Sequence, residues 1–302
     1  MKTISLIIPT LNASAYIENL LHSLENQIRK PDEILIIDSS SDDNTLEIAR
    51  AFSVKIVTIL RKDFNHGGTR NVAVRHTQGD LVILLTQDAV PKDQNFITHL
   101  IEPLKEPDIA ASFGRQFPRH DAKPPEAFAR LFNYPSQPLV KGLEDKERMG
   151  VKTYFFTNVC SCIKRPEFEE VGGFPEKTIL NEDMIVAARL INKGYKVAYV
   201  PEAVVIHSHN YSLVQQLKRY FDIGVSLKEN KWILKDVKPE GEGIKFVKEE
   251  IKYLLKERAY EYLPYVFGEI GAKFIGFKCG FSYQILPHSL RKKLSMHSFY
   301  WR

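Results

Sequence analysis

Two apolar runs of this chain each end in a carboxylate, at Asp38 and at Asp88. Asp38 closes the run at residues 34–37, and Asp88 follows the run at residues 81–85 after two polar residues. A continuous apolar run of this length is typical of a buried parallel strand. Ligands of open α/β sheets bind beyond the carboxyl ends of the strands, so we expect both acids to face one crevice that suits a nucleotide and its metal ion. For Asp88, capping of a following helix is the alternative.

Further candidates for chemistry are the acidic pair Glu182-Asp183 and the histidines His207 and His209. The acids stand at the start of a predicted helix, where they satisfy free backbone N–H groups; in the alternative reading Asp183 is a general base for an acceptor hydroxyl. The histidines follow the apolar run at residues 204–206. Alternate positions of a strand share one face, so both could reach a metal ion or a phosphate, although a structural histidine is the common case.

A loop rich in glycine and amides spans residues 65–71 and contains Gly67, Gly68 and Arg70. Glycines at a helix start let backbone N–H groups approach a phosphate, and the guanidinium of Arg70 adds positive charge. The loop is not a P-loop, because the Lys-Ser/Thr ending is missing. A plain tight turn is the alternative.

The elements that would position these residues alternate between strands and helices in the first part of the chain. Periodicity predicts strands at 4–8, 34–38, 54–60 and 81–85, and helices at 15–27, at 46–52 and from about residue 69. This order predicts an α/β fold with a parallel sheet and right-handed crossovers.

The order is less regular after Pro91. We expect a proline-rich loop or lid with short helices at 115–149, a strand at 154–163, a helix at 183–192 and strands at 195–200 and 203–207. From about Tyr211 onward the pattern is helical and amphipathic. We therefore divide the chain into a catalytic domain at 1–225 and a helical region at 226–302.

Composition excludes several classes of protein. The chain has 302 residues, with 42 Lys plus Arg against 37 Asp plus Glu and a net charge of +5, which is too small an excess to indicate a nucleic-acid binder. No apolar stretch is long enough to span a membrane, and no signal-peptide pattern opens the chain. Three cysteines without a pairing pattern fit a reducing cytoplasm, so we predict a cytoplasmic protein.

Taken together, these motifs resemble those of the family 2 glycosyltransferases, which are inverting enzymes with the GT-A nucleotide-diphospho-sugar transferase fold. The resemblance rests on three blocks: residues 7–13, residues 37–45, and Arg70-Asn71 followed by residues 79–88. Within the family, the bacterial rhamnosyltransferase branch is the most similar. The segments at 65–71, 86–89, 207–212 and 294–301 carry that second likeness.

The resemblance implies a role for each candidate residue. Asp38 would hold the pyrimidine base, Arg70 would lie near the diphosphate or base, and Asp183 would be the catalytic base of the Glu182-Asp183 motif. Asp88 would be the last acid of an Asp-x-Asp motif that contacts Mg²⁺ or Mn²⁺, with His207 completing that site and His209 a less favoured substitute. The remaining implied contacts to the nucleotide-sugar are Pro9, Thr10, Asn12, Ser40, Gly67 and Gln87. Thr86 stands where the family has the first acid, which leaves one carboxylate for the metal.

The implied activity is transfer of L-rhamnose from TDP-rhamnose to a hydroxyl of a bacterial surface glycan, free or lipid-linked. The alternatives are another UDP- or GDP-sugar donor, a nucleotidyltransferase on the same scaffold, and a non-catalytic nucleotide-sugar-binding protein. For residues 244–302 we favour packing on the catalytic domain or in a homodimer. Peripheral contact with the inner face of the membrane is the other reading.

Overall fold

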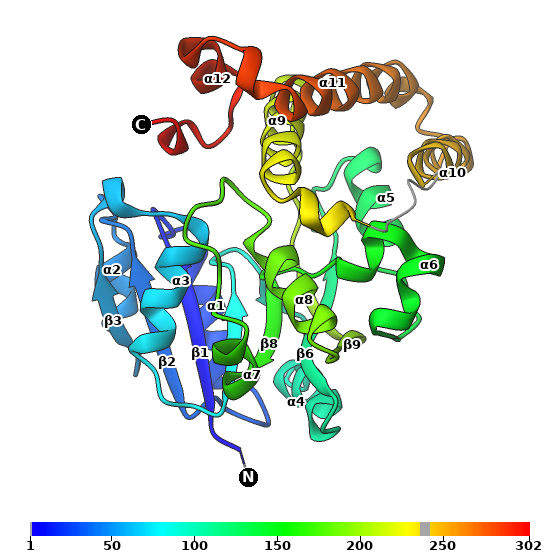
Figure 1. Cartoon of the computed structure of the whole chain (residues 1–302). Coiled ribbons are helices and arrows are strands. Elements are labelled where there is room, and N and C mark those ends of the chain that lie inside the picture. Colours follow the sequence, from blue (N-terminus) through cyan, green and yellow to red (C-terminus); the bar gives the residue numbers. More distant parts are fainter. Residues whose placement is uncertain (1, 236–241) are drawn as a thin grey trace.

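The computed structural model describes residues 2–235 and 242–302, in which helices cover both faces of a mixed sheet (Figure 1). The strands are β1 (Ile4–Thr10), β2 (Glu33–Asp38), β3 (Lys55–Thr58), β4 (Leu81–Leu85), β5 (Val90–Pro91), β6 (Ile109–Phe117), β7 (Leu139–Lys141), β8 (Cys160–Lys164) and β9 (Lys196–Ile206). The helices before the C-terminal region are α1 (Ile17–Glu25), α2 (Thr45–Ala49), α3 (His66–Arg75), α4 (Phe96–Ile101), α5 (Pro124–Asn133), α6 (Lys146–Met149), α7 (Arg165–Glu170) and α8 (Glu182–Asn192). The predicted α/β class is confirmed.

The sheet has the strand order β3-β2-β1-β4-β8-β6-β9-β5, and β7 pairs with β9 at one side. Strands β3, β2, β1 and β4 are parallel, as the alternating pattern predicts. Their side chains alternate between two cores: α1 and α4 cover one face, and α3 and α8 cover the other. This arrangement brings the carboxyl ends of β1, β2 and β4 to one edge.

The second half of the sheet corrects three of the predictions. β8 begins only at Cys160, because Gly150–Tyr154 forms a 3-10 helix; Tyr154 at its end and Phe156 after it are buried without belonging to the sheet. β6 was not predicted, since its sequence is rich in small residues; consequently the expected loop at 115–149 begins inside a strand. The two expected strands at 195–207 form one strand, β9, with a break in register next to Gly114.

Antiparallel pairing decides what else reaches the edge. β8 runs antiparallel to β4 and to β6, so the residues just before β8 lie beside the residues just after β4 and β6. A parallel sheet throughout would have placed them at opposite edges.

The C-terminal region consists of α9 (Leu213–Glu229), α10 (Glu242–Lys256), α11 (Leu263–Phe281) and α12 (His288–Leu294). These helices lie beyond the carboxyl ends of β1 and β2, at the top of Figure 1. α9 and α11 approach closely: a Cβ on Gly280 would lie 1.9 Å from the carbonyl oxygen of Phe221. α9 runs through the expected boundary at 225/226, and the division into two domains stays a prediction. Among the helices of residues 2–235 and 242–302, none combines the length and the hydropathy that a membrane span requires.

Candidate active site

The loops after β1 and β4 are tied together by one side chain, Gln87. Its Oε1 accepts a hydrogen bond from the backbone N–H of Leu11 at 2.8 Å, and its Nε2 donates to the carbonyl oxygen of Leu11 at 3.2 Å. β2 pairs with β1 in parallel, and in this register Asp38 lies opposite Thr10. The nucleotide-binding candidates on these three strands therefore share one edge of the sheet.

Asp38 is fully buried at this edge, and its carboxylate is occupied by the protein itself. Oδ1 accepts from the hydroxyls of Thr10 at 2.9 Å and Ser41 at 2.6 Å, and Oδ2 accepts from the backbone N–H of Ser41 at 2.8 Å. These bonds hold the loop after β2, in which Ser40 adopts a left-handed conformation with φ 58°. A contact between Asp38 and a pyrimidine base stays a prediction.

The other sequence candidates in this half lie in β1, in the loop that follows it and at the start of α3. Asn12 has φ 51°, and its side-chain carbonyl accepts from the backbone N–H of Asp42 at 3.0 Å. Pro9 is half-buried near the end of β1. Gly67 lies in the first turn of α3, where an added Cβ would come within 2.0 Å of the carbonyl oxygen of Pro175. That close approach accounts for the glycine, and its contact with a phosphate stays a prediction.

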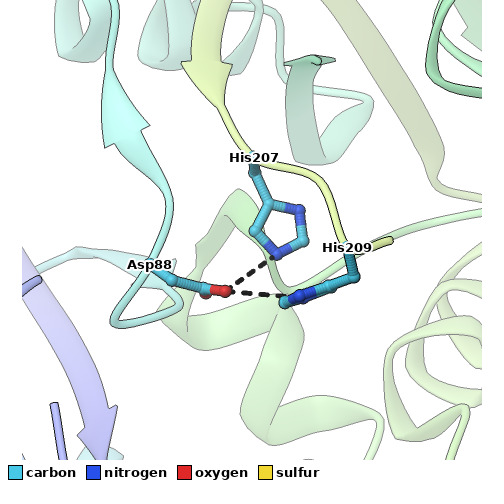
Figure 2. A group of neighbouring side chains, drawn as sticks. All are labelled: Asp88, His207 and His209. Carbon is cyan, nitrogen blue, oxygen red and sulfur yellow. Dashed lines mark ion pairs between the residues drawn. The ribbon is translucent and has the colours of Figure 1, made fainter. Parts of the chain in front are cut away.

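A cluster of Asp88, His207 and His209 forms the centre of the candidate site (Figure 2). The Asp88 Oδ2 atom lies 3.5 Å from Nε2 of His207 and 3.4 Å from Nε2 of His209. Both histidines were expected on a strand, but β9 ends at Ile206 and they lie in the loop just beyond it. The loop nevertheless turns both imidazoles toward the same carboxylate.

His207 is oriented by Gln116, whose Oε1 lies 2.9 Å from Nδ1 of the imidazole. An amide oxygen can only accept, so Nδ1 carries a proton, and Nε2 is the ring nitrogen that faces Asp88. The same amide oxygen accepts a hydrogen bond from Arg130 at 2.6 Å, which fixes the direction of the Gln116 side chain. Sequence analysis missed Gln116, because β6 was not predicted.

The chemistry of these three groups fits a divalent cation. Their ligand atoms, one from each residue, all lie within 4.8 Å of one another. Burial acts to raise the pKa of Asp88, but the hydrogen bond with His207 and the nearby imidazoles lower it to about 2. Burial, followed by the influence of His207, lowers the pKa of His209 to about 4. At neutral pH the cluster therefore offers an ionised carboxylate and a neutral His209, which are the protonation states that a metal ion requires.

The second part of the site lies at the start of α8, where Glu182 and Asp183 point to different partners. Glu182 is 5% exposed, pairs with NH1 of Arg70 at 3.1 Å and accepts from the side-chain amide of Asn158 at 3.1 Å. Asp183 is half-buried and accepts backbone hydrogen bonds from Asn158 at 3.2 Å and from Met184 at 2.8 Å. Asn158 thus contacts both acids, and sequence analysis missed it.

The two acids differ in the direction of their pKa shifts. Burial acts to raise the pKa of Glu182, but the guanidinium of Arg70, His66 and the hydrogen bond from Asn158 together keep the pKa below its usual range. For Asp183, burial and then the negative charge of Glu182 raise the pKa. Asp183 is therefore a stronger base than an ordinary aspartate, whereas Glu182 is the buried partner of Arg70.

Antiparallel pairing brings the two parts together. The N–H of Thr86, two residues before Asp88, donates to the carbonyl oxygen of Val159 at 3.1 Å, and Val159 follows Asn158 directly. The amide of Gln116 also donates to the hydroxyl of Thr157 at 3.2 Å. The loop that carries Asn158 is thus bonded on one side to Asp183 and on the other to the surroundings of Asp88.

Comparison with known proteins identifies the family. Residues 5–172 match the family described as Glycosyl transferase family 2. The chain belongs to glycosyl transferase family 2. It is 46% identical over 301 residues to the O-antigen chain rhamnosyltransferase RfbN of Salmonella typhimurium. The alignment covers 99% of this chain and 96% of RfbN. It is 43% identical over 304 residues to the O-antigen chain rhamnosyltransferase WbaN of Salmonella anatum, with 100% and 96% covered.

Solved structures of other glycosyltransferases have the same fold as this family 2 protein. The mannosyltransferase PcManGT from Pyrobaculum calidifontis, in complex with GDP-Man and Mn²⁺, has a TM-score of 0.60 at 18% identity and covers 99% of this chain and 85% of that one. The S. aureus TarS 1-349 complex with UDP-GlcNAc has a TM-score of 0.59 at 16% identity, covering 97% and 84%. The GT-A fold indicated by the motifs is confirmed, and the protein is a glycosyltransferase.

Asp88→Asn tests whether the cluster binds a metal ion. We expect the variant to lose the thermal stabilisation by Mn²⁺, because the only carboxylate in the cluster is gone. Saturation at a hundred times the dissociation constant contributes about 2.7 kcal/mol, which a melting curve resolves. The control is Asp63→Asn, the same change at an exposed residue outside the site. Equal Mn²⁺ stabilisation of both variants would show that Asp88 is not a ligand.

Proposed function

We propose that this family 2 glycosyltransferase transfers L-rhamnose from TDP-rhamnose to a hydroxyl of a growing bacterial surface polysaccharide, with inversion at the anomeric carbon. The observation that carries the proposal is the 46% and 43% identity, over nearly the full length, to two O-antigen chain rhamnosyltransferases. A basic carboxylate and a cluster of possible metal ligands at one edge of the sheet support the chemistry.

In the proposed reaction, Asp183 removes the proton from the acceptor hydroxyl while that oxygen attacks the anomeric carbon. The bond between this carbon and the diphosphate oxygen breaks, and its electron pair leaves with TDP. Attack from the face opposite the leaving group converts a β-linked donor into an α-L-rhamnoside. The raised pKa of Asp183 suits this role, because a general base is most effective when its pKa lies near the working pH.

Asp88, His207 and His209 would hold Mg²⁺ or Mn²⁺, which supplies positive charge against the diphosphate. Gln116 holds the ring of His207 so that its Nε2 faces that position. The proposed contacts to the nucleotide-sugar come from the ends of β1 and β2, the loops after β1, β2 and β4, and the start of α3. They are Pro9, Thr10, Asn12, Asp38, Ser40, Gly67, Arg70 and Gln87. The link between Gln87 and Leu11 supports this grouping, because it joins the loop after β1 to the loop that carries Asp88.

A panel of nucleotide sugars and an Asp183→Asn variant test the function. We expect the wild-type chain to turn over TDP-rhamnose in preference to UDP- and GDP-sugars. Asp183→Asn should lower the rate about 10²- to 10⁴-fold, because the general base is lost, while TDP affinity in Mn²⁺ stays within about twofold. The control is Asp108→Asn, at the opposite edge of the sheet. Transfer at the wild-type rate by Asp183→Asn would remove this residue from the base role.

The pH dependence tests the electrostatics of the acidic pair. The base must be deprotonated, so turnover falls as the pH drops through the pKa of Asp183. Because that pKa is raised, the acidic limb should lie above the range of an ordinary aspartate. Glu182→Gln removes the neighbouring charge and leaves Arg70 unpaired; both changes lower the pKa of Asp183 and move the limb to lower pH. A limb that stays in place or moves upward would contradict this assignment.

We also propose that α11 contacts a membrane surface, where a lipid-linked acceptor would lie. Phe267, Phe274 and Ile275 are 63%, 62% and 53% exposed, and their spacing places them on one face of the helix, next to Lys278. Paired with a nearby lysine, an exposed apolar face suits anionic lipid.

Cosedimentation with phosphatidylglycerol vesicles tests the membrane contact. We expect Phe267→Ser with Phe274→Ser to reduce binding severalfold, because the apolar area that enters the interface is lost. Ile28→Ser is the control, since Ile28 is 64% exposed in the loop that precedes β2. No binding by the wild-type chain would reject the proposal. If the wild-type chain dimerises and the double variant does not, the exposed face of α11 would be assigned to contact with a second copy of the chain instead.

A further inference from the structure

The segment Ser295–Arg302, which we name the returning segment, lies against the start of α3 although more than 220 residues separate them in sequence. Figure 1 shows it, in red, above that part of the fold. Arg302 donates from NH1 to the carbonyl oxygen of Lys62 at 2.5 Å. The ring of Phe299 packs edge to face on Phe64, with centroids 5.7 Å apart. The returning segment therefore forms part of the wall beside the nucleotide-binding edge.

His297 is the residue of this segment that contacts His66, the first residue of α3. Its Nδ1 lies 3.5 Å from Nε2 of His66, and the two rings meet edge to face at 4.6 Å. The backbone carbonyl of His66 accepts a hydrogen bond from NH1 of Arg70 at 2.8 Å. Arg70 in turn pairs with Glu182 at 3.1 Å. Two contacts thus join His297 to the ion pair that lies beside the proposed base.

A buried carboxylate on α9 fixes the backbone at His297. Asp222 is 0% exposed, and its Oδ2 accepts from the backbone N–H groups of Met296 at 2.9 Å and His297 at 3.1 Å. Burying a carboxylate is costly unless hydrogen bonds compensate, so this pair of bonds holds the returning segment in one position. The position of His297 therefore depends on α9.

The returning segment also supports the loop that leads into the acidic pair. Trp301 is buried in a small core with Ile179, close before Glu182 in sequence. The next residues of the loop are held by Ser226 of α9: its hydroxyl donates to the carbonyl oxygen of Leu180 at 2.9 Å and lies 3.3 Å from Nδ2 of Asn181. Asn181 adopts φ 65°, a left-handed conformation that the surrounding contacts must maintain.

From these contacts we infer that the returning segment is a positioning element of the catalytic centre, and that His297 is its positioning residue. It acts on Asp183 through His66, Arg70 and Glu182, and it touches no substrate. The inference rests on the proposed function in that Asp183 is taken as the base. A purely structural role would change stability alone.

His297→Ala tests the inference in the full chain. We expect kcat for donor turnover to fall about tenfold or more, since small displacements of a reacting group are costly, while TDP affinity in Mn²⁺ stays within about twofold. Loss of the His297 ring should also let water reach the side chains around His66 and Glu182, which weakens the burial that raises the pKa of Asp183. The acidic limb of the pH profile of turnover should therefore move to lower pH. His297→Gln, which keeps a polar atom at this position, should recover part of the rate.

The matched control is His288→Ala, which removes an exposed histidine at the start of α12. Asp222→Asn is a second variant: it weakens the anchor without touching His297, and it should lower kcat in the same direction. Turnover is measured with whichever donor the wild-type chain uses. Failure with TDP-rhamnose would overturn the donor assignment alone. A His297→Ala chain with a lower melting temperature but an unchanged kcat and pH profile would overturn the positioning role, as would an equal loss of TDP affinity.

Discussion

The buried ion pair between Arg70 and Glu182 is the interaction on which the candidate active site depends. Both side chains are 7% exposed, so neither charge is compensated by water. Removing one partner of such a pair typically costs about 3–5 kcal/mol, although the intact pair adds little net stability. Its value here is positional: it fixes the start of α3 to the start of α8 and sets a negative charge beside Asp183. That charge, together with burial, makes Asp183 a stronger base.

The cluster of Asp88 and the two histidines depends on a different device, the side-chain amide of Gln116. The amide oxygen accepts from His207 and Arg130, and the amide nitrogen donates to Thr157. Hydrogen bonds in both directions leave the amide one orientation, and this orientation selects the tautomer of His207. The group that would hold the metal ion is thereby connected to the loop that holds Asp183. A metal-binding cluster and a base can cooperate in one displacement only when their separation is fixed in this way.

The C-terminal region contributes to the same geometry from outside the sheet. α9 and α11 pack closely together beyond the carboxyl ends of the strands. From α9, Asp222 binds the backbone of the returning segment and Ser226 binds the loop before Glu182. The two connections of His297 differ in length. The hydrogen bonds from the backbone of Met296 and His297 to the buried Asp222 are 2.9 and 3.1 Å long, whereas the nitrogens of the His66 and His297 rings lie 3.5 Å apart.

The sequence by itself determined the parallel half of the fold, the family and most of the acidic residues of the site. Apolar runs that end at Asp38 and Asp88, and a helix that begins at the acidic pair, are local patterns, and local periodicity reads them directly. Only the tertiary structure placed Gln116 and Asn158 at the site, turned His209 toward Asp88, and brought His297 to His66. Asn158 depends on the antiparallel pairing of β8, Gln116 on a strand of small residues, His209 on the loop after β9, and His297 on a C-terminal segment that packs against the start of α3. Pairing between segments far apart in sequence leaves no periodic signal within either segment, so it is decided only when the chain folds.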